Sequence, residues 1–189
     1  MTILQDIQKG RIPARLTVDD LYALTEAGVF AENENIELIE GEIVPMAASK
    51  ASIHERMKSM LVRALVFALP DDARLFVEPT LTLSGDTALE PDLAVWRKGG
   101  LSREMRGADM LLIVEVADSS LGYDLRTKAR LYARHGVREY WVVDATREEV
   151  RVHRNPVGEI YTDRAEFASH EPVTASLLPG VTIQLDQLD

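Results

Sequence analysis

The sequence predicts an α/β domain in which a mixed central sheet is flanked by helices. From residue 52 onward, the hydrophobic patterns read helix, strand, strand, strand, helix, strand. The run 111–144 alone reads strand, short loop, helix and strand. A length of 189 residues, 46% hydrophobic and 28% charged, suits one globular domain. We therefore expect a single domain over 1–189, with a core at about 36–154.

The N-terminal part predicts an arm, a helix and a strand pair. Residues 1–16 show no hydrophobic period, so we expect an extended arm. Thr17 to Asp20 resembles a capping box ahead of a short helix that ends at Gly28. Isolated apolar residues around Gly41, in 32–46, predict two short strands or one bent strand. The helix and strand pair would form an N-terminal extension to the central sheet.

The middle of the chain predicts a core helix and two strands. Apolar residues recur at helical spacing over 52–69, and Pro70 ends the pattern. His54 lies in the first turn, where a solvent-facing or capping histidine is commoner than a functional one. Residues 74–83 predict one strand closed by a turn at 84–86, and 90–96 predict another. The polar segment 97–107 predicts a mobile loop.

Residues 111–144 carry the strongest chemical signal. The apolar run 111–116 predicts a strand covered on both faces, yet it contains Glu115. Burying an ionised carboxylate is costly unless it is paired, protonated or bound to a cation. A helix is expected over 121–135, with Ser119 or Ser120 as N-cap and Gly136 as C-cap.

Asp124, Lys128 and Tyr132 lie at i, i+4 and i+8 and therefore share one face of this helix. The aromatic and β-branched run 139–144 predicts the next strand. Beyond it we expect a hairpin around 155–158 and a tail of short strands.

Composition and charge exclude several classes of protein. The absence of cysteine excludes disulfides and thiolate-bound zinc or iron–sulfur sites. No signal-peptide core or membrane span is recognisable, so we expect a cytoplasmic protein without membrane contact. A net charge of −10 argues against a surface broadly coated with nucleic acid. The charge is uneven, however, because residues 1–50 carry net −5 and residues 97–154 carry net +3.

Several ordered motifs together resemble the Uma2 (Uma-two) family of predicted restriction endonucleases, a branch of the PD-(D/E)XK nuclease superfamily. The resemblance covers roughly 16–144. The motifs are ELIEGEIV, then His54, then PDLAVW, VEVADSS, YDLRTKARLYARHGV and EYWVVD. It implies a restriction-endonuclease-like fold and a metal-dependent endonuclease that hydrolyses DNA.

The resemblance also implies which residues act. Asp92 would be the acid of the PD motif and Glu115 the acid of the (D/E)XK motif, both metal ligands. The position two residues after Glu115 is Ala117 rather than the usual lysine, so the family pattern points to Lys128 on the helix. Glu37 would be an accessory metal ligand. The upstream acids Glu40, Glu42 and Glu78 remain alternatives to Glu37 in that role.

The chemistry agrees with this assignment independently. Phosphodiester hydrolysis adds negative charge to an anionic centre, and two converging carboxylates can hold Mg²⁺ or Mn²⁺ to offset it. A nearby lysine can orient the water or screen the phosphate. Simpler interpretations exist for two of the residues. Asp92 could make a turn after proline, and Lys128 could merely pair with Asp124.

Two other functions remain open. The acidic surface favours a catalytically inactive binding or assembly module on the same fold, and a nuclease acting on RNA or small nucleotides is a further alternative. By analogy with nucleases that must cut two strands, we expect a homodimer.

Overall fold

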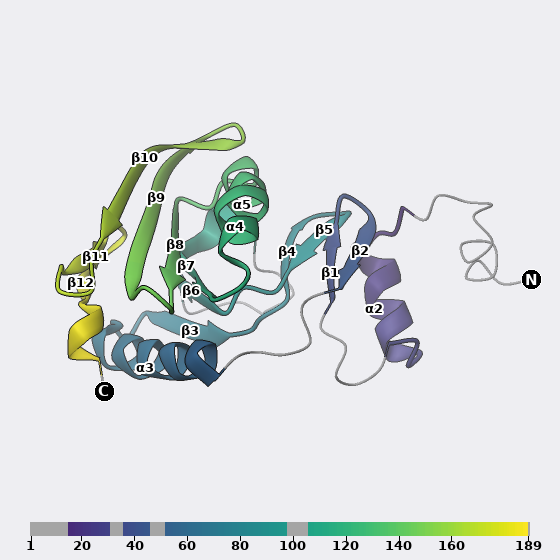
Figure 1. Cartoon of the computed structure of the whole chain (residues 1–189). Coiled ribbons are helices and arrows are strands. Elements are labelled where there is room, and N and C mark those ends of the chain that lie inside the picture. The colour runs from purple at the N-terminus through teal and green to yellow at the C-terminus, as the bar shows by residue number, and fades with distance from the viewer. Residues whose placement is uncertain (1–14, 31–35, 46–51, 98–105, 189) are drawn as a thin grey trace, which may run out of the picture. The chain divides into compact units, whose positions relative to one another are not determined.

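The computed structural model describes residues 15–30, 36–45, 52–97 and 106–188. The chain forms two compact units (Figure 1): Met1–Ala48 with Thr82–Leu89, and Ser49–Leu81 with Glu90–Asp189. The single domain expected over 1–189 stays a prediction. Most of the expected arm, and nearly all of the expected loop at 97–107, lie outside the described residues.

The smaller unit combines one helix with a four-stranded sheet of order β2-β1-β5-β4. Helix α2 (Val18–Glu26) begins with a complete capping box. The Asp20 N–H donates to Thr17 Oγ1 at 3.1 Å, and the Thr17 N–H donates to the Asp20 carboxylate at 2.9 Å. Gly41, at φ +82°, makes the turn between β1 and β2. The strands are β1 (Ile36–Ile39), β2 (Glu42–Pro45), β4 (Leu81–Ser84) and β5 (Thr87–Leu89). The expected helix and strand pair are therefore confirmed.

The larger unit is built on a six-stranded sheet of order β10-β9-β8-β7-β6-β3. The central pair β7–β8 is parallel and the other neighbouring pairs are antiparallel, so the mixed sheet is confirmed. All residues of β7 are buried, as the continuous apolar run predicts for a central strand. The strands are β3 (Ala73–Val77), β6 (Leu93–Arg97), β7 (Met110–Ala117), β8 (Glu139–Asp144), β9 (Glu149–Val157) and β10 (Ile160–Phe167).

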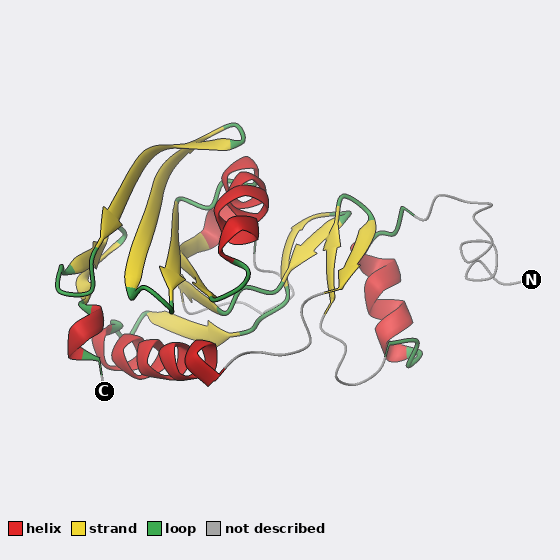
Figure 2. Ribbon diagram, in the orientation of Figure 1, coloured by secondary structure: helices red, strands yellow, loops and turns green. Residues whose placement is uncertain are grey.

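Helices lie on both faces of this sheet (Figure 2). Helix α3 (Ser52–Ala68) packs against β3 and β7. The crossover from β7 to β8 is helical, and its last part packs against β9 and β10. We call it the crossover helix; it consists of α4 (Leu121–Tyr123), η3 (Asp124–Lys128) and α5 (Ala129–Arg134). The remaining elements are η2 (Gly107–Asp109), β11 (Val173–Ala175), β12 (Leu178–Ile183) and η4 (Leu185–Gln187). No helix in the described ranges is both long and apolar enough to span a membrane.

The alternation of β7 positions the candidate site. Val114 belongs to the main core, where it packs with Met57, Leu61 and Leu65 of α3. Because successive strand residues point to opposite faces, Glu115 points to the other face, toward the crossover helix. The register of one central strand thus fixes both the core and the buried carboxylate.

Two strand predictions were wrong in detail. The strand expected over 74–83 is divided into β3 and β4, which belong to different sheets. Glu78, at φ +50°, and Pro79 break it, because a left-handed residue and a missing N–H cannot continue a strand. The hairpin turn lies at Gly158–Glu159 rather than 155–158, since Pro156 still pairs with Tyr161.

Candidate active site

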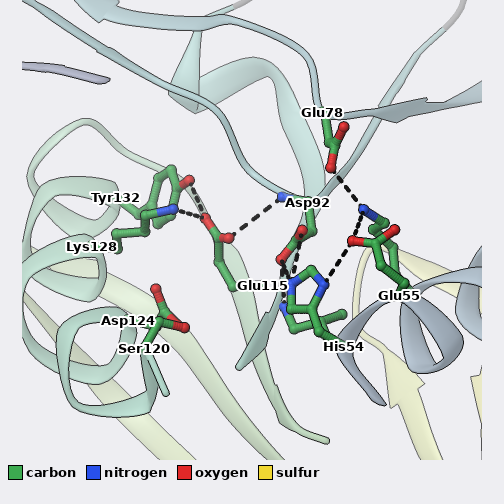
Figure 3. A network of polar contacts seen from close by, with 11 residues as sticks. His54, Glu55, Glu78, Asp92, Glu115, Ser120, Asp124, Lys128 and Tyr132 are labelled. Carbon is green, nitrogen blue, oxygen red and sulfur yellow. Dashed lines mark hydrogen bonds and ion pairs between the residues drawn. The ribbon is translucent and has the colours of Figure 1, made fainter. Parts of the chain in front are cut away.

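Asp92 lies directly before β6 and is held by both β7 and α3 (Figure 3). Its Oδ2 accepts a hydrogen bond from the Val116 N–H at 2.8 Å, and each of its oxygens lies 3.3 Å from His54 Nε2. The Asp92 N–H lies 3.4 Å from Glu115 Oε2. Leu93 pairs with Val114, which places the preceding residue opposite Glu115. The register of β6 and β7 therefore brings the two predicted acids together.

Glu115 is 3% exposed, and the crossover helix fixes its carboxylate. Lys128 Nζ and the Tyr132 hydroxyl each donate to Oε1 at 2.9 Å. Such partners offset the cost of removing an ionised carboxylate from water. The sequence places Tyr132 on the same helix face as Lys128, but the contact of its hydroxyl with Glu115 was not predicted. Its position four residues after Lys128, on the same helix face, was the available signal.

A π-helical turn carries the lysine, whereas the sequence predicted a continuous α-helix over 121–135. The Ala129 N–H donates to the Asp124 carbonyl five residues earlier, and the Tyr140 hydroxyl donates to the same carbonyl at 3.2 Å. Such turns occur often at functional sites. The expected N-cap at Ser120 makes no capping bond, because its hydroxyl donates to Asp124 Oδ2 at 2.6 Å. The left-handed C-cap at Gly136 is confirmed, at φ +78°.

A second polar group lies on the α3 side of Asp92 (Figure 3). His54 Nδ1 lies 3.2 Å from Glu55 Oε1, and Lys58 Nζ donates to Glu55 Oε1 at 2.9 Å and to Glu78 Oε1 at 2.7 Å. His54 and Lys58 are both buried. The sequence-based preference for a solvent-facing or capping His54 was therefore wrong. Lys58 was missed, although its i, i+4 spacing from His54 places both on one face of α3.

The surroundings of Asp92 favour the ionised form of its carboxyl group. Burial raises the pKa of Asp92, but the hydrogen bond from His54, the His54 charge, the Val116 N–H and the Lys128 charge together lower it below 3.8. The hydrogen bond with Asp92 raises the pKa of His54 above 6.5, against the opposing effect of burial. The site therefore holds a carboxylate that stays charged at neutral pH.

The four candidate accessory acids divide between the two units. Glu37 lies on β1, and Glu40 and Glu42 lie at the β1–β2 turn, all in the smaller unit. Within the larger unit, the Glu78 N–H donates to the Asp92 carbonyl at 2.9 Å, while the Glu78 carboxylate accepts from Lys58. The assignment of Glu37 as an accessory ligand stays a prediction.

Asp92 and Glu115 fit a hard divalent cation. Carboxylate oxygens are the ligands that Mg²⁺ and Mn²⁺ prefer, and Mg²⁺ commonly uses one or two carboxylates with waters and substrate phosphates. Among the described residues, no group of three or more His, Cys, Asp or Glu side chains could form an all-protein cage. Asp92 and Glu115 are thus a pair of carboxylates, the donor type and number that Mg²⁺ commonly takes from a protein.

Comparisons with known proteins identify the family and the fold. A family model named Uma2, described as "Putative restriction endonuclease", matches residues 18–186. The crystal structure of a putative nuclease belonging to DUF820 from Anabaena variabilis has a similar fold, with a TM-score of 0.70 at 20% identity. The similarity covers 90% of this chain and 96% of that one. No curated protein matches the chain.

Proposed function

The chain belongs to the Uma2 family of putative restriction endonucleases, and on that premise we propose that it is a metal-dependent endonuclease hydrolysing DNA phosphodiester bonds. One observation carries the proposal. Asp92 and Glu115, from neighbouring strands, lie together, and Lys128 donates to Glu115 at 2.9 Å. Two buried acids and a buried lysine cost stability that packing alone does not explain. Hydrolysis of a charged phosphodiester requires these group types.

Asp92 and Glu115 are the proposed ligands of Mg²⁺ or Mn²⁺, and Glu37 is a proposed further ligand. When bound, such a cation activates a water molecule and neutralises charge on the phosphate. The Val116 N–H and His54 orient the Asp92 carboxylate, and Tyr132 orients that of Glu115. Ligands held in this way need little rearrangement on binding a cation.

Lys128 is the proposed counterpart of the lysine that usually stands two residues after the second acid of the motif. It lies on the crossover helix instead of on β7. Its ammonium group lies beside Glu115 at a buried position. From there it orients the attacking water or stabilises the extra negative charge on the phosphate. Its supply from a helix explains how Ala117 can occupy the usual lysine position.

The substrate and setting are part of the proposal. DNA is the proposed substrate because the family carries the description "Putative restriction endonuclease". We also propose action in the cytoplasm, and a homodimer because two strands must be cut. A nuclease for RNA or small nucleotides would use the same three residues. An inactive binding module would retain the fold without needing a metal.

Cleavage of a substrate panel tests the proposal. Supercoiled plasmid, linear and branched DNA, single-stranded DNA, RNA and a small phosphodiester are each incubated with Mg²⁺ or Mn²⁺, and with a chelator. We expect metal-dependent DNA cleavage that Asp92→Asn, Glu115→Gln and Lys128→Met each abolish. The exposed variant Glu26→Gln, on helix α2 and outside both the candidate site and any arginine-lined surface, is prepared identically as the matched control and should cut like the wild type. Cleavage of RNA or of the small phosphodiester alone would support the alternative nuclease function. A wild type that cuts none of the substrates would support the inactive binding module.

A further inference from the structure

An arginine-lined trough lies on the outer side of the crossover helix, within the larger unit. A cavity of about 350 Å³ between this helix and the start of β10 is lined by Arg126, Arg130 and Arg164, with Glu159. A second cavity of about 330 Å³ adjoins it through Leu125 and Arg164. We define the trough as the first cavity with its three arginines. Its formal charge of +2 contrasts with −10 for the whole chain.

Two of the three arginines of the trough, Arg126 and Arg164, differ from the third in their partners. Arg130 pairs with Glu159 at 3.3 Å, and Glu159 also lies 3.6 Å from Arg134. Arg126 and Arg164 are exposed, and within the described ranges no carboxylate lies at ion-pair distance from either. Arg164 Nε instead donates to the Tyr161 carbonyl at 3.2 Å, which fixes the direction of its side chain. Two exposed guanidinium groups thus border one cavity.

Gly122 lets the Arg126 guanidinium lie close against the helix backbone. A Cβ built on Gly122 would lie 2.8 Å from the Arg126 guanidinium, so a larger residue there would displace that group. Guanidinium forks match phosphate oxygens in geometry as well as charge. The trough therefore has the chemistry of a site for phosphate groups.

Its position relates it to the reactive centre. Arg126 and Arg130 flank Lys128 by two residues on each side, which places them roughly opposite it around the helix. A helix with its side chains is about 10–12 Å across. At about 3.4 Å of rise per phosphate along one strand, that width corresponds to about three nucleotides, and a strand that passes around the helix spans at least that many. A strand in the trough would therefore place there a phosphate at least about three nucleotides from the scissile one.

We infer that the trough binds the sugar–phosphate backbone of the DNA substrate, at least about three nucleotides from the bond that is cut. This rests on the proposed nuclease function. It also accounts for how a strongly acidic protein could hold a polyanion. Backbone contacts of this kind position the duplex without reading its sequence.

The salt dependence of binding tests the inference. Binding of a fluorescent DNA duplex to the whole protein is measured without divalent metal, over a range of salt concentrations. The double variant Arg126→Gln/Arg164→Gln should bind about tenfold more weakly, and its slope of log K against log salt should be shallower by about 2. The control Arg147→Gln removes an exposed arginine outside the trough and should leave both quantities close to wild type.

Three results would overturn the inference. An unchanged affinity and slope in the double variant would place the backbone elsewhere. An equal loss in Arg147→Gln would show a general charge effect, and tighter binding of polyglutamate than of DNA would indicate an acidic protein partner. Failure of the nuclease proposal gives a distinguishable result: the double variant would still bind DNA more weakly than the wild type, but no divalent metal would induce cleavage by the wild type. Cleavage by wild type together with unaltered binding by the double variant would reject the trough alone.

Discussion

Asp92 and Glu115 are joined across neighbouring antiparallel strands: the Asp92 backbone N–H lies 3.4 Å from Glu115 Oε2. The reciprocal contact runs from β7, where the Val116 N–H donates to Asp92 Oδ2 at 2.8 Å. Each carboxylate is thus held by a backbone N–H of the neighbouring segment. The register itself is set by the backbone pairing of β6 with β7, so Asp92→Asn and Glu115→Gln should leave it intact.

Lys128→Met should abolish cleavage and also destabilise the fold. Removing the lysine leaves Glu115 as a buried charge without its ion-pair partner, which costs about 3–5 kcal/mol. Urea unfolding followed by circular dichroism measures the loss. The double variant Glu115→Gln/Lys128→Met should recover a large part of it, because no buried charge remains unpaired. Additive losses would show that the two groups do not stabilise each other.

His54→Ala should lower Mn²⁺ affinity and cleavage by about 10–100-fold, the usual effect of losing a group that orients a metal ligand. His54→Gln keeps a side-chain donor near Asp92 and should retain more of both quantities. Isothermal titration with Mn²⁺ and plasmid cleavage supply the two readouts. If His54→Ala keeps wild-type metal affinity, the histidine has no part in holding Asp92.

Glu139→Gln should destabilise the protein by about 2–4 kcal/mol without affecting the reactive centre. The Glu139 carboxylate is fully buried, and Trp141 Nε1 at 2.9 Å and Arg154 at 2.8 Å both contact Oε1. The Ser176 N–H donates to Oε2 at 2.7 Å, which ties β8 to the segment after β11. The midpoint of urea unfolding should fall while the cleavage rate of the folded fraction stays near wild type. A selective loss of cleavage would contradict this purely structural role.

Stability should fall on acidification through His153. Burial lowers its pKa below 6.5, with Arg164 adding to the effect. Below pH 6.5 the unfolded chain therefore binds more protons at this position than the folded chain. Its contribution is fully present above pH 6.5 and declines as the pH falls from there toward the lower folded-state value.

His153→Phe removes this titration while retaining a ring between Tyr140 and Tyr161. The free energy of unfolding, measured by urea titration between about pH 7 and 5, should then depend less on pH than in the wild type. Equal pH dependence in the two proteins would contradict the assignment to His153.

Periodicity sufficed for the parts of the fold that local sequence determines. Helix α3 ends at Ala68, shortly before Pro70, as the spacing of its apolar residues predicts. Strand β7 is buried along its whole length, as its continuous apolar run predicts. The break at Glu78 depends on a positive φ that no apolar pattern encodes. The π-helical turn at Asp124–Lys128 likewise depends on a tertiary contact, the Tyr140 hydroxyl on the Asp124 carbonyl.

The candidate site divides in the same way. Asp92, Glu115 and Lys128 follow from motif order, and the structure brings them together. Helical spacing places Tyr132 beside Lys128 and Lys58 beside His54, but it does not identify their carboxylate partners, Glu115 and Glu78, which packing brings to them. The contact of His54 with Asp92 spans 38 residues, beyond the reach of local pattern.

The central claim is that Asp92 and Glu115 bind the divalent cation that cuts DNA. The most direct measurement titrates Mn²⁺ into wild type, Asp92→Asn and Glu115→Gln by calorimetry, and follows plasmid cleavage by the same preparations over the same metal concentrations. The account predicts that wild type binds Mn²⁺, that cleavage rises with occupancy of this site, and that both variants lose binding and cleavage together. Cleavage that survives in either variant, or wild-type Mn²⁺ binding that both variants retain, would contradict it.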